Sequence, residues 1–290
     1  MKTLKQPQIL QSELNKISRY LKEVSKFGYK PWVNVRQSHT YGQGHEIFCH
    51  KTQRTHCLLS RGERPIFFEL ERNPSVIELF EQYPLPISET MELAVELNIL
   101  HPGAYKERHK NDGVIPAKTM SSDIVALKKL KNGKEKLVVY SFKYKKSLDK
   151  TQTSPQSVAR TEKKLELEKA FWTKQGIEFV LVNEDRFSSN YIYNLEYLRE
   201  CYDFPDELDV SEDFYCLFIR ELENLFLANT DFTLKQHLTS VSQTLNIDLH
   251  QTQSLFQKAV YEFDLEVDLE TKVELYRTVP LAFEEVSNAS

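Results

Sequence analysis

The 290-residue sequence has little cysteine, little glycine and no long apolar run. Its four cysteines are too few for a disulfide framework in a chain of this length, so we expect reduced thiols in a reducing compartment. The eight glycines form no phosphate-cradling motif, and the chain has neither an internal repeat nor a low-complexity segment. Residues 1–15 lack the apolar stretch of a signal peptide or a membrane-spanning helix, which predicts a cytoplasmic location and no membrane partner.

The composition is that of an ordinary globular protein, with 40% hydrophobic, 28% charged and 11% aromatic residues. The net charge of -4 conceals a strong polarity along the chain. Residues 201–290 contain 18 acidic and 5 basic residues, whereas residues 1–200 contain 24 acidic and 33 basic residues. Basic residues neutralise phosphates and release counterions, so we expect any nucleic acid to bind the first two thirds of the chain.

Helical periodicity alternates with β-prone stretches up to about residue 187, which predicts an α/β domain with a mixed sheet. A polar linker is expected at residues 147–156. Ser88 is a plausible N-cap for one of the helices. The expected helices cover residues 9–28, 65–72, 88–97 and 158–174, and the expected strands cover 46–50, 55–59, 76–83, 123–130, 136–145 and 177–182.

From about residue 188 onward the pattern is helical throughout, which predicts two domains, 1–187 and 188–290. Within the second, helices at 234–245 and 250–263 flank a tight turn and resemble a helix-turn-helix or winged-helix unit. A DNA-recognition helix needs basic residues, but the second of these helices has only Lys258, with Glu262 nearby. We therefore expect the acidic domain to bind a protein partner.

Hydrolysis of a phosphodiester needs carboxylates that hold Mg²⁺, a cation that stabilises the transition state, and an activated water. Glu63, Asp123 and Lys143 are the candidates for these roles. The last two lie in consecutive predicted strands joined around Asn132-Gly133, so the length of this loop decides whether they meet.

A two-residue loop would place Asp123 opposite Phe142 and on the other face of the sheet from Lys143. A three-residue loop, 131–133, would pair Leu130 with Lys134 and place Asp123 opposite Ser141. Lys143 then becomes a diagonal neighbour of Asp123 on the same face. We favour the three-residue loop.

Each candidate also has a structural explanation. Ser60-Arg61-Gly62-Glu63 fits a capping box, in which Glu63 only satisfies a backbone N–H. Asp123 before a strand is usually a turn residue, and Lys143 close to other lysines is usually a solvated charge. From the spacing alone, these explanations stay open.

The pairs Cys49-His50 and His56-Cys57 suggest a zinc site on a hairpin. Alternation along a strand argues against it, because adjacent side chains point to opposite faces and cannot both reach one ion. We do not expect zinc there.

Several segments resemble the TnsA family of transposon endonucleases, in the same order and spacing over about residues 31–198. The matching segments are HKTQRTHCLLS (50–60), NPSV (73–76), EQYPL (81–85), MSSD (120–123) and KLELE (164–168), the last ahead of Phe171-Trp172. The resemblance implies a restriction-endonuclease-like domain of the PD-(D/E)xK type, followed by a smaller helical domain. The catalytic Glu, Asp and Lys of the family fall on Glu63, Asp123 and Lys143.

By this resemblance, Glu63 and Asp123 bind Mg²⁺, with Mn²⁺ also tolerated, while Lys143 orients water or stabilises the transition state. Glu168 on the following helix is expected to support the site. The family usually has an acid or an amide two positions before the lysine, where this chain has Ser141, a short ligand that would reach a metal through water. Gly62 and Pro65 stand where the family shows uninterrupted helix. The way Glu63 approaches the metal is therefore expected to depart from the family pattern more than that of Asp123 does.

The implied function is cleavage of transposon-end DNA at the 5′ ends, on the non-transferred strand, in the bacterial cytoplasm. A TnsB-like transposase would cut and join the 3′ ends, and a TnsC-like AAA+ ATPase would regulate both and dock on the acidic domain. Two alternatives stay open: a standalone restriction or repair nuclease, and a non-catalytic DNA-binding scaffold subunit with a decayed site.

Overall fold

The computed structural model describes residues 4–37 and 43–282. The chain divides into two compact units, one of residues 1–70 and 75–186 and the other of residues 71–74 and 187–290. Among the described residues, no helix combines the length and the apolar character that crossing a membrane requires.

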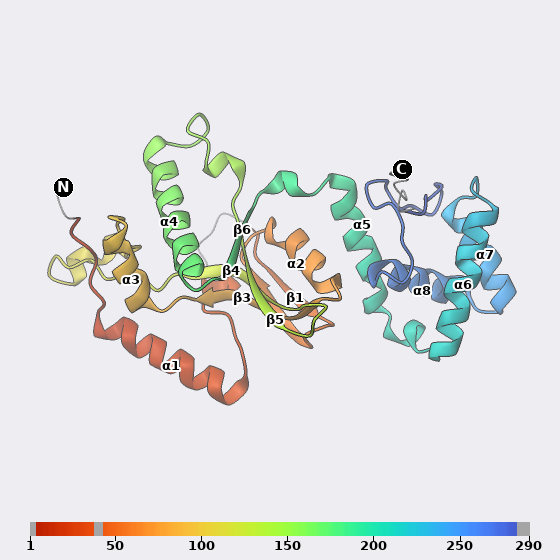
Figure 1. Ribbon diagram of the computed structural model, residues 1–290, viewed down its shortest axis with the longest axis horizontal. Coiled ribbons are helices and arrows are strands. Elements are labelled where there is room, and N and C mark those ends of the chain that lie inside the picture. The colour runs from red at the N-terminus through yellow and green to blue at the C-terminus, as the bar shows by residue number, and fades with distance from the viewer. Residues whose placement is uncertain (1–3, 38–42, 283–290) are drawn as a thin grey trace. The chain divides into compact units, whose positions relative to one another are not determined.

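A four-stranded sheet forms the centre of the first unit (Figure 1). Its strands follow the order β3 (Val76–Pro84), β4 (Ser121–Lys129), β5 (Glu135–Phe142) and β6 (Glu178–Val182). The first three are antiparallel neighbours, whereas β6 runs parallel to β5 after the crossover helix α4 (Pro155–Lys174). This mixed sheet with helices is the α/β architecture predicted from the sequence.

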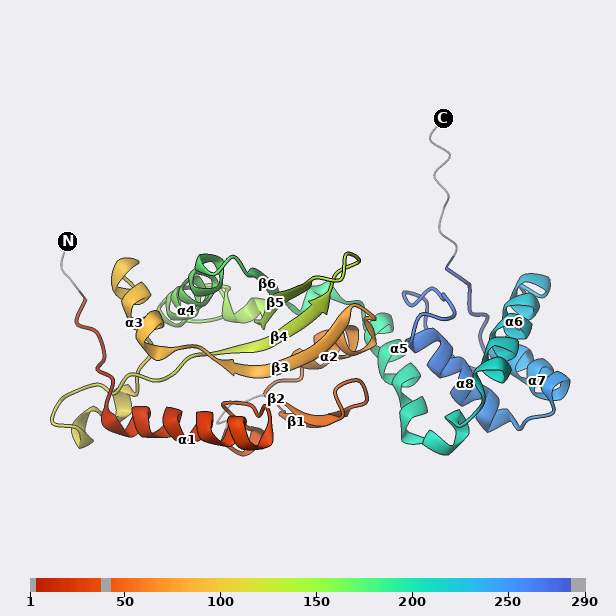
Figure 2. The same cartoon turned by 60° about the horizontal axis from the view of Figure 1, so that its bottom comes forward.

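Figure 2 shows helices α3 (Ile87–Glu96) and α4 on one side of the sheet, and α1 (Gln11–Phe27) and the hairpin of β1 (His45–Cys49) and β2 (Arg54–Leu58) on the other. Helix α2 (Glu63–Arg72) follows the hairpin. Short 3₁₀ helices of this unit are η1 (Val35–Gln37), η2 (Tyr105–Lys110), η3 (Lys145–Ser147) and η4 (Glu184–Arg186).

The main apolar core lies between the sheet and the pair α3 and α4. Val125 of β4 and Val139 of β5 are paired in register and both belong to this core, together with Phe171 and Trp172 of α4. Side chains two residues apart on a strand share a face. Asp123 and Ser141, two residues beyond these valines, therefore point to the α4 side of the sheet.

Three local predictions need correction. Helix α4 begins inside the expected linker, because Ser154 caps it by accepting a hydrogen bond from the backbone N–H of Ser157 and Pro155 occupies the first turn. Ser88 lies within α3 and caps nothing, since this helix begins at Ile87. The strand expected at residues 136–145 ends at Phe142, so Lys143 lies just beyond β5. The backbone N–H of Lys143 donates to the carbonyl of Val182, the last residue of β6.

The second unit consists mainly of helices α5 (Ser189–Arg199), α6 (Glu212–Ala228), α7 (Leu234–Leu245) and α8 (Leu249–Tyr261). Two 3₁₀ helices, η5 (Glu200–Asp203) and η6 (Pro205–Leu208), precede α6. The predicted pair of helices with a tight turn is confirmed in α7 and α8. Asn246 provides the turn in the left-handed conformation, with φ of 53°.

Residues 71–74 belong to the second unit because of buried polar contacts. Glu71 accepts hydrogen bonds from Nε of Arg199, at 2.6 Å, and from the Tyr261 hydroxyl, at 2.7 Å. Arg72 donates to the backbone carbonyls of Val260 and Tyr261 at the end of α8. Glu71 and Arg72 are the last residues of α2, so this helix contributes residues 63–70 to the first unit and its last two residues to the second.

A buried network joins the β1–β2 hairpin to the sheet within the first unit. The Glu81 carboxylate on β3 accepts two hydrogen bonds from Arg54, at 3.0 and 2.8 Å, and pairs with Nδ1 of His56 at 2.8 Å. Burial alone would raise the pKa of Glu81, but these bonds from His56 and Arg54 hold it below its usual value. The Glu81 side chain is only 1% exposed. Its carboxylate stays ionised in this dry environment because Arg54 and His56 pair with it.

We expect Glu81→Ala to lower the free energy of unfolding by about 3 kcal/mol, because it leaves Arg54 and His56 without their buried partner. Urea unfolding monitored by circular dichroism measures this loss. Glu78→Ala is the matched control: Glu78 lies 3.8 Å from Arg54 and is 35% exposed, so its loss should change little. Equal effects of the two substitutions would contradict a special role of the buried carboxylate.

Candidate active site

The turn between β4 and β5 sets the register of the site. Gly133 has a φ of 79°, and its N–H donates to the carbonyl of Leu130, while the N–H of Leu130 donates to the carbonyl of Lys134. The loop therefore has three residues, and Ile124 pairs with Tyr140. The predicted register, with Asp123 opposite Ser141, is confirmed.

Asp123 lies at the centre of a group of polar side chains. Its Oδ2 accepts hydrogen bonds from the backbone N–H of Phe142 at 2.7 Å, from Nζ of Lys143 at 3.1 Å and from Oγ of Ser141 at 3.2 Å. The Asp123 side chain is 18% exposed and that of Lys143 is 24% exposed. This carboxylate and this ammonium group are thus in contact and still reachable from solvent.

Glu63 is the first residue of α2 and is buried. Its carboxylate accepts hydrogen bonds from the backbone N–H of Leu59 at 3.0 Å and from Oγ of Ser60 at 2.8 Å. The helix-capping explanation therefore holds in part, although the N–H that Glu63 satisfies is that of Leu59. Glu63 also lies close enough to Asp123 for the two carboxylates to repel each other. The two explanations of Glu63 are compatible.

Gly62 and Pro65 explain how Glu63 reaches this position. Pro65 falls in the first turn of α2, where its missing N–H costs the helix nothing. A Cβ atom at Gly62 would collide with the aromatic ring of Phe142, the last residue of β5. The absent side chain therefore lets the start of α2 approach the strand that precedes Lys143.

Glu168 is buried on α4, with 2% of its surface exposed. Oγ of Ser141 lies 3.5 Å from its Oε2, while its Oε1 is a buried atom without a hydrogen-bond partner among the described residues. One turn further along α4, Nε1 of Trp172 donates to Oγ of Ser122 on β4 at 2.8 Å. That bond anchors α4 against β4, and Ser141 connects Glu168 to Asp123.

The charges of these groups depend strongly on one another. Burial, followed by repulsion from Asp123, raises the pKa of Glu63 to about 8 and that of Glu168 to about 7. Burial alone would lower the pKa of Lys143, but the negative charge of Asp123 and the two glutamates raises it above its usual value. Near neutral pH the site therefore holds one charged lysine and more carboxyl groups than it can ionise without a further cation.

Other candidate groups have different surroundings. Both ring nitrogens of His56 already have partners, the Glu81 carboxylate and the Thr52 hydroxyl, so His56 is not directed at Cys49 or Cys57 as a zinc site would require.

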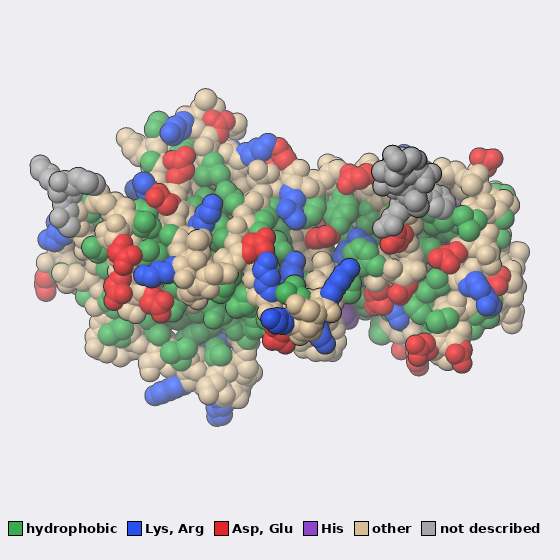
Figure 3. All heavy atoms as spheres, in the orientation of Figure 1, with side chains coloured by type: hydrophobic (Ala, Val, Ile, Leu, Met, Phe, Trp, Pro, Cys, Tyr) green, Lys and Arg blue, Asp and Glu red, His purple; other side chains and the backbone are tan. Residues whose placement is uncertain are grey.

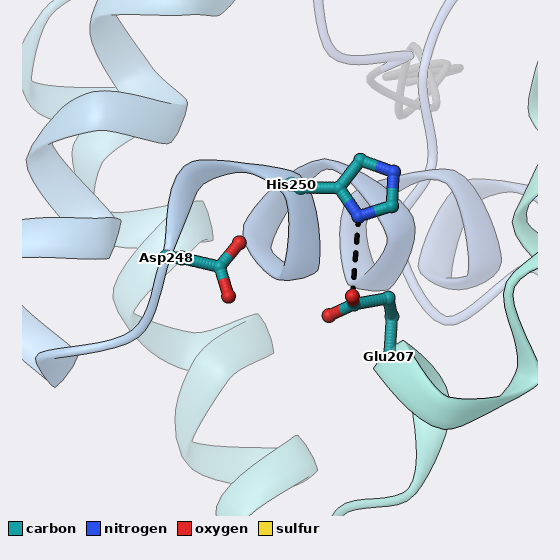
Figure 4. Close-up of side chains that lie close together, drawn as sticks. All are labelled: Glu207, Asp248 and His250. Carbon is teal, nitrogen blue, oxygen red and sulfur yellow. Dashed lines mark ion pairs between the residues drawn. The ribbon is translucent and has the colours of Figure 1, made fainter.

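In the second unit, Glu207, Asp248 and His250 offer ligand atoms within 4.8 Å of one another (Figure 4), a closer group than the first-unit carboxylates form. No spacing pattern in the sequence predicts this group, because Glu207 is far from the other two residues in the chain.

Surface contacts account for this second-unit group. His250 pairs with Glu207 at 3.3 Å and packs edge-on against the ring of Phe204. Asp248 caps α8 by accepting a hydrogen bond from the N–H of Gln251 at 2.8 Å. These side chains stabilise the start of α8, and we assign no chemistry to them.

We expect Glu168→Gln to raise the melting temperature of the metal-free protein at pH 8 by roughly 5 °C. A folded-state pKa above the unfolded value of about 4.5 costs stability that grows as the pH rises towards about 7, and glutamine removes this cost. At pH 5 the difference should fall to about a quarter of its value at pH 8, as differential scanning fluorimetry can measure. Glu166→Gln, on the exposed side of the same helix, is the control, and an equal shift at both pH values would refute this electrostatic origin.

Two comparisons identify relatives of this chain. Residues 73–184 match a family model described as "TnsA-like endonuclease N terminal". The chain is also 31% identical over 188 residues to the Tn7 transposition protein TnsA of Escherichia coli, a match that covers 63% of this chain and 61% of that protein. Asp123, Ser141, Lys143 and Glu168 lie inside the segment matched by the family model, and Glu63 precedes it. The chain is therefore similar to TnsA-like proteins, and almost all of the matched endonuclease segment lies in the first unit.

Proposed function

We propose that this protein is a metal-dependent DNA endonuclease that cuts the 5′ ends of a transposon, on the non-transferred strand, together with TnsB-like and TnsC-like partners. The observation that carries the proposal is the convergence of Asp123, Lys143 and two buried glutamates at one end of β4 and β5. The match to a transposition protein named TnsA supports the same function. Carboxylates beside one cation are the groups that phosphodiester hydrolysis requires.

The residues of the site fit a divalent metal ion. The buried Oε1 of Glu168 has no hydrogen-bond partner among the described residues, and Glu63 and Glu168 both have raised pKa values. Crowded carboxyl oxygens of this kind are the ligands that Mg²⁺ and Mn²⁺ prefer. Glu63 and Asp123 would hold the ion, Glu168 would support them, and Ser141 would take part through a water. When bound, the ion would polarise a phosphoryl oxygen and acidify a coordinated water.

Lys143 supplies the positive charge that belongs to the protein itself. Its ammonium group is held by the Asp123 carboxylate at 3.1 Å and by the backbone carbonyl of Phe142 at 2.6 Å. Its raised pKa keeps it charged at neutral pH. A fixed ammonium in a partly dry site stabilises charge that develops on a phosphoryl group far better than a mobile surface lysine does.

The charge distribution supports DNA binding by the first unit. Figure 3 shows Lys and Arg side chains gathered over the tip of the β4–β5 hairpin, where Lys129, Lys131, Lys134 and Lys136 are exposed. This hairpin also carries Asp123, so phosphates drawn to the lysines lie along the strand that leads to the site. The acidic residues from 201 onward suit a basic protein surface, which supports a partner-binding role for the second unit.

We expect Asp123→Ala and Lys143→Ala each to reduce 5′-strand cleavage by at least about 100-fold, because each removes a charged group from the reacting centre. The measurement is strand-specific cleavage of labelled transposon-end DNA with Mg²⁺, with and without the partner proteins. Lys145→Ala provides the control: Lys145 lies two residues beyond Lys143, is 56% exposed and pairs with Asp185 at the surface, so most activity should remain.

The same assay separates the alternatives. Cleavage by the wild type without partners would indicate a standalone nuclease, and no cleavage under any condition would indicate a scaffold subunit. Normal cutting by Asp123→Ala would remove this residue from the site and overturn the proposed mechanism.

A further inference from the structure

A pocket of about 530 Å³ lies beside the N-terminal half of α4, within the first unit and away from the catalytic carboxylates. Apolar side chains, among them Leu4, Ile99 and Leu100, supply much of its lining. Arg160, Lys163 and Lys164 also line it. Among the lining residues that the structure describes, none is acidic. An apolar pocket with three cations fits a ligand that has a flat or apolar body and carries negative charge.

The cations of the pocket form one row with a residue of the candidate active site. Arg160, Lys164 and Glu168 are spaced four residues apart on α4, so they lie on the same face of the helix, about 6 Å apart along its axis. Lys164 lies near enough to Glu168 to lower the pKa of that carboxyl, although burial and Asp123 raise it overall. The pocket is thus connected to the carboxylates by a single helix face.

Two of these cations are available for a ligand. Within the part of the chain that the structure describes, neither Arg160 nor Lys164 forms an ion pair, whereas Lys163 pairs with Glu166 at 2.7 Å. Successive phosphates of a nucleic-acid strand are separated by about one turn of such a helix, so a backbone running along α4 could place one phosphate at each cation. An acidic peptide can present carboxylates at a similar spacing. The choice of a nucleic acid therefore rests on the aromatic surface beside the row of cations.

Tyr105 of η2 provides an aromatic surface at the pocket. It is 45% exposed and lines the pocket, together with Arg160. Burial raises the pKa of its hydroxyl and the Arg160 cation counteracts part of this rise, which places the ring and the guanidinium close together. An exposed aromatic ring beside an arginine is a common platform on which a nucleobase stacks.

We propose that this pocket binds a nucleotide of the DNA substrate, unstacked from its neighbours, with its base against Tyr105 and its phosphates along Arg160 and Lys164. The proposal rests on the proposed nuclease function, because the row of cations leads to Glu168. It adds a second DNA contact: one strand is held on α4, along the helix face that leads to Glu168.

The test uses the full chain and a ten-nucleotide single strand with 2-aminopurine at its centre, in Ca²⁺ so that no cutting occurs. Stacking on Tyr105 should change the 2-aminopurine fluorescence as protein is added. Ala159→Trp, which fills the pocket from an exposed position of α4, should weaken binding about tenfold, the loss expected for one stacked base. Lys164→Gln should reduce the slope of binding against salt by about 0.7, the value for one phosphate of a single strand.

Two controls make the result specific. Lys169→Gln removes an exposed cation of α4 that does not line the pocket and should leave the fluorescence titration unchanged. With the wild-type protein, fluorescence anisotropy of 5′-fluorescein-labelled ten-nucleotide strands compares the intact strand with one in which abasic spacers replace every base. The abasic strand should bind at least about tenfold more weakly, which tests the pocket without altering the protein.

Equal binding of the intact and abasic strands, or undiminished binding by Ala159→Trp, would overturn the proposal and leave the pocket to a ligand of another class. Failure of the nuclease function would be recognised separately: the wild type would then bind 2-aminopurine in the pocket but cut no DNA with Mg²⁺. Cleavage by the wild type together with unchanged cleavage and binding by Ala159→Trp would reject the pocket alone.

Discussion

The register between β4 and β5 is the constraint on which the rest of the site depends. A shift of one residue would turn Asp123 away from Ser141 and Lys143, because successive side chains of a strand alternate between faces. The left-handed Gly133 closes a three-residue loop and fixes the register about ten residues away from the carboxylate. A turn without chemistry of its own thereby determines whether a carboxylate and a lysine meet.

Around that register, the structure tolerates an electrostatic arrangement that is unfavourable by itself. Glu63 and Glu168 are buried near Asp123, and Lys143 offsets part of their negative charge, with a further contribution from Lys164 at Glu168. The packing of α4, through Leu167, Phe171 and Trp172, provides the apolar contacts that keep Glu168 in place. Carboxyl groups that are buried close to other negative charge destabilise the fold, and such groups are typical of functional sites. The apolar core beside them supplies the compensating stability.

Local patterns predicted much of this fold, and long-range contacts account for what they missed. Turn chemistry at Asn132-Gly133 and helical spacing in α7 are local, so the sequence was sufficient for both. The contacts of Glu81 with Arg54 and His56, and of Glu207 with His250, join residues far apart in sequence, and no spacing rule reveals them. Ser154 was placed in a linker because its polar neighbours concealed a helix cap.

One face of helix α4 serves two sites. The same row of side chains contributes Glu168 to the candidate active site and lines the apolar pocket with Arg160 and Lys164. Each residue of an α-helix turns the next by about 100°. The insertion or deletion of a single residue between Lys164 and Glu168 would therefore rotate the pocket cations away from the carboxylates while leaving the helix itself intact. The loops at either end of α4 are free of this requirement, whereas the helix between these two residues can neither gain nor lose a single residue without separating the pocket cations from the carboxylates.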